Sequence, residues 1–200
     1  MNRKSIRIFA ALGLLVAASL SLLAQGGPGY GRGMRGNGQC PACQAAPAPT
    51  QPLTADETKW LLFMREEEKL ARDVYTALYE TSKLNVFRNI ARSEQRHFDS
   101  VGLLLERYGV SEPVNSQPEV FTNATLQTLY SKLVADGTTS PAAALKAGVT
   151  IEEQDIADLE AAIAATRKTD IKRVYTNLLS GSLNHLEAFQ RQLEMAGVEP

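Results

Sequence analysis

Four groups of carboxylate and imidazole side chains have the types and spacing that could bind metal ions. They are Glu66-Glu67-Glu68, Glu94-x-x-His97, Glu152-Glu153-x-Asp155 and His185. Residues three apart share one face of a helix, so Glu94 and His97 can present a carboxylate and an imidazole to the same ion. The chain has only two histidines and two cysteines. A metal centre here must therefore consist mainly of carboxylates.

Apolar residues recur at helical spacing through most of the chain after residue 55, and no strand-like alternation of useful length occurs. We expect long helices over 56–82, from about 85 to 109, over 141–166 and over 169–196, with a short helix over 123–135. Thr54-x-x-Glu57 is a capping-box pattern, and Ser140-Pro141 is typical of a helix start. The predicted fold is all-α, with two antiparallel hairpins joined by a long connection. Ferritin-like four-helix bundles share this topology.

The predicted inner stripes of these helices carry Glu94, His97, Glu152 and His185, while Glu67 and Glu68 lie at the inner edge and Glu66 faces water. Buried carboxylates from three helices are unstable unless positive charge joins them. Two divalent cations, with bridging carboxylates and neutral imidazoles as ligands, would supply it. Each group also has a simpler explanation: a solvated acidic face, a favourable helix dipole, or a core histidine with one hydrogen bond. The inward position of both histidines favours the metal centre.

Several of these segments resemble rubrerythrin-type proteins of the ferritin-like superfamily. Glu68-Lys-Leu-Ala-Arg-Asp-Val-Tyr75 resembles their first-helix signature Glu-x-x-Ala-Arg-x-x-Tyr, and Ile90-Ala91 followed by Glu94-x-x-His97 resembles their second helix. Glu152-x-x-Asp155 and His185-x-x-x-Phe189 are looser matches to the third and fourth. The segment EEEKLARDVY is also similar to a ferritin-like family of prokaryotes whose function is not established.

The resemblance implies a di-iron carboxylate site. Its most transferable ligands are Glu68, Glu94 and His97, with Glu152, Asp155 and His185 completing the set and Tyr75 as an aromatic side chain beside the metals. The fourth helix departs from the pattern, because Ser182 stands where Glu-x-x-His requires a carboxylate. Asp155, Glu67 or Glu153 could fill that place, or the second metal site could be weak or absent.

The first 55 residues are expected to lie outside the folded domain. Residues 1–24 have Arg3, Lys4 and Arg7 before an uncharged apolar run, the layout of a secretory signal. If it is not cleaved, this segment is the chain's contact with a membrane. Residues 25–55 form a Gly- and Pro-rich linker containing Cys40 and Cys43, whose pairing as a disulfide, or role in redox or metal handling, stays open. We expect a periplasmic or extracellular protein.

Segment 56–200 carries 16 basic and 22 acidic residues, a net charge of −6, which argues against a nucleic-acid partner. We expect an exported di-iron oxidoreductase that reacts with dioxygen or peroxide. It would depend on an external electron donor, since a four-cysteine iron module is absent from the sequence. A homodimer is one expected assembly. Two alternatives are a metal-binding or storage module without turnover, and an envelope-stress helical bundle with a vestigial site.

Overall fold

The computed structural model describes residues 51–112 and 117–199, and these residues form five helices and no strands. The helices are α1 (Ala55–Ser82), α2 (Asn85–Arg107), α3 (Ala124–Gly137), α4 (Pro141–Ala165) and α5 (Thr169–Met195). The predicted all-α class and the helix positions are confirmed, with bounds within about two residues of those expected. The predicted signal segment and residues 25–50 of the predicted linker, which include Cys40 and Cys43, lie outside the described residues. In the described part, no helix is long and apolar enough to span a membrane.

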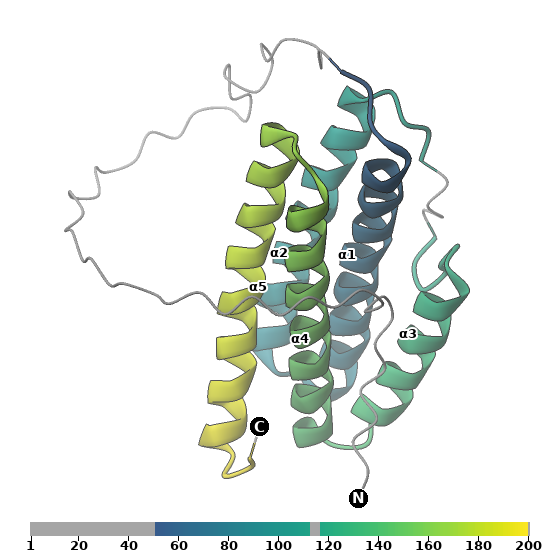
Figure 1. Ribbon diagram of the computed structural model, residues 1–200. Coiled ribbons are helices and arrows are strands. Elements are labelled where there is room, and N and C mark those ends of the chain that lie inside the picture. The colour runs from purple at the N-terminus through teal and green to yellow at the C-terminus, as the bar shows by residue number, and fades with distance from the viewer. Residues whose placement is uncertain (1–50, 113–116, 200) are drawn as a thin grey trace, which may run out of the picture. The chain divides into compact units, whose positions relative to one another are not determined.

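The four long helices pack side by side, and the shorter α3 lies against α1 and α4 (Figure 1). α1 contacts α2 and α4, and α5 also contacts α2 and α4, so the long helices enclose one common interior. The two-residue connection after Ser82 reverses the chain direction, with Lys83 in the left-handed conformation at φ 55°. α1 and α2 are therefore an antiparallel hairpin. α4 and α5 form a second hairpin through the short connection at Thr166–Lys168.

The predicted caps form at both helix starts. Thr54 accepts a hydrogen bond from the Glu57 backbone N–H, and the Glu57 side chain accepts one from the Thr54 N–H, which completes the capping box. Glu57 also accepts a 2.6 Å hydrogen bond from the hydroxyl of Thr166. This carboxylate therefore ties the start of α1 to the α4–α5 connection. At α4, the Ser140 side chain accepts from the Ala143 N–H, with Pro141 in the first helical position.

Glu66 corrects one prediction, since its side chain is buried and does not face water. Its carboxylate accepts hydrogen bonds from the backbone N–H groups of Thr122 and Asn123, just before α3. Unpaired N–H groups at a helix start attract a carboxylate, and this tertiary partner cannot be seen in the periodicity of α1. Glu66 therefore fixes the connection that precedes α3 onto α1.

A buried ion pair holds the same connection one turn further along α1. Lys69 is 1% exposed, and its ammonium group lies 2.9 Å from Asp73 Oδ2 and 3.2 Å from the Val120 carbonyl oxygen. Asp73 also accepts hydrogen bonds from the Arg72 guanidinium and from the Glu119 N–H, where the backbone has φ 66°. A buried carboxylate with this many donors is stable, and removing it would leave Lys69 charged and unpaired.

We predict that Asp73→Ala lowers the free energy of unfolding by about 3–5 kcal/mol, because the Lys69 charge loses its partner in the interior. The matched control is Asp136→Ala, which removes the acid of the exposed Lys132–Asp136 pair and should cost less than about 1 kcal/mol. Urea unfolding of the two variants measures both values. Equal losses would contradict the structural role assigned to Asp73.

Candidate metal centre

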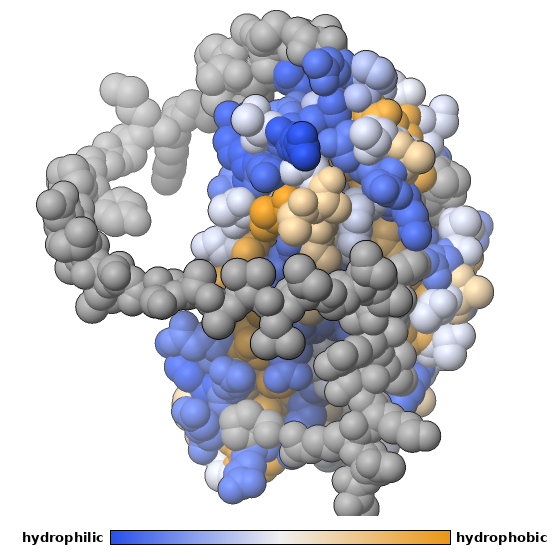
Figure 2. All heavy atoms as spheres, viewed as in Figure 1, coloured by the Kyte–Doolittle hydropathy of each residue, from blue (hydrophilic) through white to orange (hydrophobic). Residues whose placement is uncertain are grey.

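The interior between the two hairpins contains six carboxyl groups and both histidines of the chain. All eight residues are buried, with at most 9% exposure: Glu67, Glu68, Glu94, His97, Glu152, Asp155, Asp158 and His185. In contrast, hydrophilic residues make up much of the coloured face of the molecule in Figure 2. Such a concentration of acids in the interior needs compensating positive charge.

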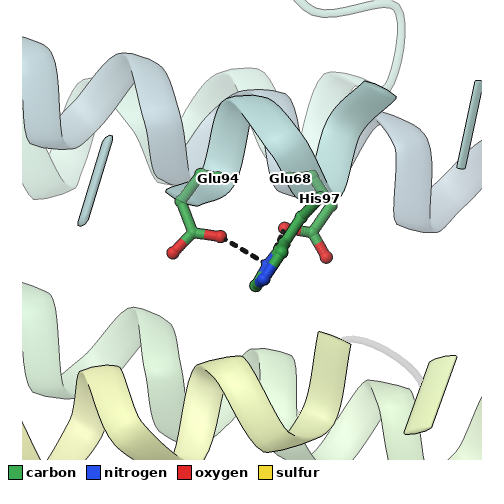
Figure 3. A group of neighbouring side chains, drawn as sticks. All are labelled: Glu68, Glu94 and His97. Atoms are coloured by element: carbon green, nitrogen blue, oxygen red, sulfur yellow. Dashed lines mark ion pairs between the residues drawn. The ribbon is translucent and has the colours of Figure 1, made fainter. Parts of the chain in front are cut away.

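Two three-residue groups within this interior share one carboxylate. Ligand atoms of Glu68, Glu94 and His97 lie within 4.8 Å of one another, and so do those of Glu94, Glu152 and His185. Figure 3 shows the first group, with Glu68 on α1 and Glu94 and His97 on α2, pointing toward the opposite hairpin. Glu94 belongs to both groups, so its two oxygens lie between the two histidines.

The distances around Glu94 are short. Glu94 Oε2 lies 2.8 Å from His97 Nδ1, and Glu94 Oε1 lies 2.7 Å from His185 Nδ1. Glu68 Oε2 is 3.3 Å from His97 Nδ1, and Glu152 Oε1 is 3.6 Å from His185 Nδ1. The two imidazole rings stack with centroids 5.5 Å apart. Both histidines thus present Nδ1 to the carboxylates.

These close contacts lack hydrogen-bond alignment. His97 Nδ1, His185 Nδ1, Glu94 Oε1 and Glu68 Oε1 are all buried and have no hydrogen-bond partner of acceptable geometry. Buried polar atoms in native proteins are almost always paired, and those that are not call for an unseen water or ion. Nitrogen and oxygen atoms that converge without hydrogen-bonding one another are the arrangement expected of ligands around a cation, so the residues fit a metal.

The electrostatics agree with this arrangement. Burial raises the pKa of Glu152 to about 8, with Glu94 adding to the effect, and burial raises the pKa of Asp155 to about 7. Burial also raises the pKa of Glu67 and Glu68 well above the usual range, and Asp155 is the strongest charged contributor to both. The raised pKa values mean that these carboxyl groups bind protons more readily than exposed carboxyl groups do.

Glu94 behaves in the opposite way. Burial would raise the pKa of its carboxyl, but His185 and His97 hold it down to about 2. Glu152 and Glu94 together raise the pKa of His185 to about 9, although burial alone would lower it. Glu94 is therefore the carboxylate that stays ionised, between two groups that carry its counter-charge.

Two further side chains complete the surroundings of Glu152 and Asp155. The Tyr75 hydroxyl is fully buried and donates a 2.6 Å hydrogen bond to Glu152 Oε1. The Tyr75 ring packs on Phe189, with centroids 5.2 Å apart. Ser182 donates a 2.5 Å hydrogen bond to Asp155 Oδ2.

Of the weaker candidates from the sequence, Glu153 is exposed on α4 and does not join the buried acids. Glu67 is 4% exposed and interacts with Asp158, a residue the sequence reasoning missed. Asp158 follows Glu152 and Asp155 at intervals of three along α4, and this repeat could have identified it. The three acids of the triplet therefore have different neighbours. Glu66 binds the backbone just before α3, Glu67 interacts with Asp158, and Glu68 lies with Glu94 and His97.

Gly181 is a second residue that the sequence reasoning did not single out. A Cβ atom at this α5 position would lie 2.6 Å from His97 Nε2 and 2.7 Å from His97 Cε1. Because real Cβ atoms do not approach other atoms so closely, the bare glycine backbone provides the space for the His97 ring. A glycine four residues before a core histidine carries little signal in a single sequence.

Comparison with known proteins identifies relatives over the same region of the chain. Residues 57–199 match the model of an uncharacterised protein domain, DUF2202. The uncharacterised protein MJ0754 of Methanocaldococcus jannaschii is 53% identical over 150 residues, which are 74% of this chain and 81% of that protein. The crystal structure of the hypothetical protein MJ0754 aligns with TM-score 0.75 and 51% identity, covering 78% of this chain and 89% of that chain. The chain therefore belongs to the DUF2202 family.

Proposed function

We propose that this protein binds two divalent metal ions between the two hairpins of a ferritin-like bundle, and that the metal is iron. The observation that carries the proposal is Glu94, whose oxygens lie 2.8 and 2.7 Å from the Nδ1 atoms of His97 and His185 without hydrogen-bond alignment. A carboxylate that serves two imidazoles in this way is suited to bridge two ions. Carboxylate and imidazole ligands from facing helices are the donor set of di-iron bundle proteins.

In this proposal, Glu68 and His97 hold one ion and Glu152 and His185 hold the other. The Tyr75 hydroxyl orients Glu152 through its hydrogen bond to Oε1. The lack of a side chain at Gly181 leaves room for the His97 ring. The carboxylates are almost completely buried, whereas the two histidine side chains are each 11% exposed. The histidine side chains are thus the part of the proposed centre most accessible to solvent.

We further propose that the centre oxidises iron with dioxygen or peroxide, in an exported protein supplied with electrons from outside the chain. Two bound irons would supply two electrons on going from the ferrous to the ferric state, which with two protons would reduce peroxide to water or dioxygen to peroxide, and the external donor would return the irons to the ferrous state. The proposed role of the chain is to hold the ions, keep bulk water away and provide proton-holding groups nearby. Binding without turnover is the second candidate, and Ser182 in place of a carboxylate favours it.

We predict that the purified protein binds two equivalents of Fe(II) in an anaerobic titration, and that Glu94→Gln weakens both at least about 100-fold, because both ions lose the same ligand. The control is Glu66→Gln, which alters a buried acid outside the centre and should leave both equivalents bound. Elemental analysis and calorimetry measure stoichiometry and affinity. If the protein takes up only trace metal, the proposal fails.

Admitting dioxygen to the Fe(II)-loaded protein separates the two candidate functions. An oxidoreductase consumes chelatable Fe(II) much faster than free Fe(II) disappears in the same buffer, and Glu94→Gln abolishes the acceleration. If the protein binds Fe(II) but does not speed its oxidation, the result supports a metal-binding module without turnover. If Glu94→Ala raises the stability of metal-free protein and metal stabilises neither form, the site is vestigial.

We predict that the metal-free protein loses more than about 2 kcal/mol of stability as the pH rises from 5 to 9. The pKa values of Glu152, Asp155 and His185, about 8, 7 and 9, are all raised above their unfolded values. Groups of this kind stabilise the fold below their unfolded pKa, and that contribution is lost as the pH rises through the folded pKa. Urea unfolding in the presence of a chelator, at pH 5, 7 and 9, measures the change.

The double variant Glu152→Gln/Asp155→Asn cannot lose these two protons, so its stability should depend less on pH than that of the unmodified protein. A bound cation replaces the protons, so metal-loaded protein should also keep its stability at pH 9. Stability that is constant or rising between pH 5 and 9 in metal-free protein would contradict the assigned electrostatics.

We predict that Gly181→Ala weakens Fe(II) binding at least about tenfold, because the new methyl group displaces the His97 ring. Gly137→Ala is the matched control, since its Cβ would meet Leu78 Cδ2 at 2.7 Å, away from the centre. Both variants should lose stability, and only the first should lose affinity for Fe(II) by calorimetry. Unchanged affinity in Gly181→Ala would show that the His97 ring does not depend on this space.

A further inference from the structure

The outward face of α2 carries its charges in two blocks. Six exposed residues, which we call the outer stripe, follow one another along this face: Arg88, Arg92, Arg96, Asp99, Leu103 and Glu106. The basic members lie in the first half of the helix and the acidic members in the second half. Leu103, between the two acids, is 65% exposed. The outer stripe is distinct from the buried side of α2 that carries Glu94 and His97.

The spacing of the outer stripe is that of a helix-packing surface. Successive members are four, four, three, four and three residues apart. At about 100° per residue, they stay within roughly 80° of the circumference of the helix. Alternating steps of three and four residues form the seam along which two helices pack side by side. A second helix that packs on this seam must bring charges opposite to those of five of its six members.

The charges of the outer stripe are not neutralised within the described part of the chain. No ion pair there includes any of its three arginines or its two acids. Arg96 lies 3.2 Å from the Ser93 hydroxyl, and Asp99 accepts a 2.9 Å hydrogen bond from the Gln95 amide. These partners are neutral, so the stripe keeps its charge for a partner outside the chain.

The order of these charges is complementary to itself when a second α2 lies antiparallel. In a register centred between residues 97 and 98, the facing pairs are Arg96–Asp99, Arg92–Leu103 and, within one residue, Arg88–Glu106. Two-fold symmetry repeats each contact, which gives four ion pairs. Both leucines are then covered by the apolar stems of arginine side chains. A parallel arrangement would instead set like charges against each other.

A hollow beside the acidic half of the stripe has the lining that an arginine side chain needs. It has a volume of about 620 Å³ and is lined by residues of α1, α2 and the segment that follows α2. The lining includes Asp99, Leu103 and Glu106, together with Glu112, which forms an ion pair with Arg65. The carboxylates suit a guanidinium group and the leucine suits its aliphatic stem. The hollow therefore favours the arginines of a second copy in the antiparallel register.

We infer that the outer stripe is the contact surface between two copies of this chain, which pack α2 against α2 antiparallel about a two-fold axis. In such a contact the same patch serves both subunits, so it must be complementary to itself, as the order of charges in the stripe is. The inference does not depend on metal binding. Exposed ion pairs are individually weak and are screened by salt, so the dimer is expected to be sensitive to ionic strength.

An anionic surface, such as a vesicle of acidic phospholipids, is another partner that would neutralise the three arginines. On such a surface Asp99 and Glu106 of the same stripe would face like charge, which opposes binding. The antiparallel pair neutralises both blocks at once, and the order of the charges therefore favours a second copy.

Sedimentation velocity of the purified full chain over a range of concentrations measures the equilibrium between monomer and dimer. A dimer should form at low ionic strength. Its dissociation constant should rise at least about tenfold between about 20 and 500 mM NaCl, because salt screens exposed ion pairs.

Charge reversal tests the register. Arg96→Glu alone and Asp99→Arg alone should each weaken the dimer at least about tenfold, since each sets like charges against each other at two symmetric places. An equimolar mixture of the two variants should associate again, because each brings the charge that the other has lost. The double variant Arg96→Glu/Asp99→Arg should also dimerise, with the ion pair reversed. The control is Arg191→Glu, the same charge change at an exposed α5 position paired with Glu187, which should dimerise as the unmodified protein does.

Four results would overturn the inference. The first is a protein that stays monomeric at every concentration and at low salt. The second is a dimer that both single variants leave unchanged, since another face would then join the copies. The third is a loss of association that neither the mixture nor the double variant restores. The fourth is a monomer that binds acidic vesicles through the arginines. None of these results affects the proposed metal binding, because no residue of the outer stripe belongs to the centre.

Discussion

The interior of this protein is governed by an imbalance of charge. Six carboxyl groups and two imidazoles occupy the space between two helical hairpins, where an uncompensated charge costs several kcal/mol. Protons can neutralise the excess, which is what the raised pKa values of Glu152 and Asp155 express. Divalent cations can also neutralise this charge. Fewer of them are needed, because each carries two charges, and they hold their ligands at defined positions. The four long helices therefore pack around an interior whose excess negative charge needs protons or cations to balance it.

The remaining polar contacts inside the fold support this interior without joining it. Glu66 and the Lys69–Asp73 pair attach the segment before α3 to α1, and Glu57 attaches the α4–α5 connection to the start of α1. Each of these acids has full hydrogen-bonding or ionic partners within the chain. The unpaired atoms instead concentrate around Glu94, and this contrast distinguishes the candidate centre from ordinary buried ion pairs.

Small side chains determine how the larger ones at the centre are arranged. Gly181 leaves space for the His97 ring on α2, and Ser182 donates a hydrogen bond to the Asp155 carboxyl on α4. Two neighbouring residues of α5 therefore determine the positions of side chains on two other helices. Tyr75 has a comparable effect on Glu152 from α1. A substitution at any of these three positions would alter the centre without removing one of its acids or histidines.

The sequence by itself determined the all-α class, the extent of the helices and the inward position of Glu94, His97, Glu152 and His185, because helical periodicity and capping are local properties of the chain. Tertiary structure alone decided where the Glu66-Glu67-Glu68 triplet goes, because adjacent residues at the edge of a stripe face different helices. It also decided the parts played by Asp158, Gly181 and the Ser182–Asp155 bond. Those depend on distances between helices that are far apart in the chain, and no spacing within one helix encodes them.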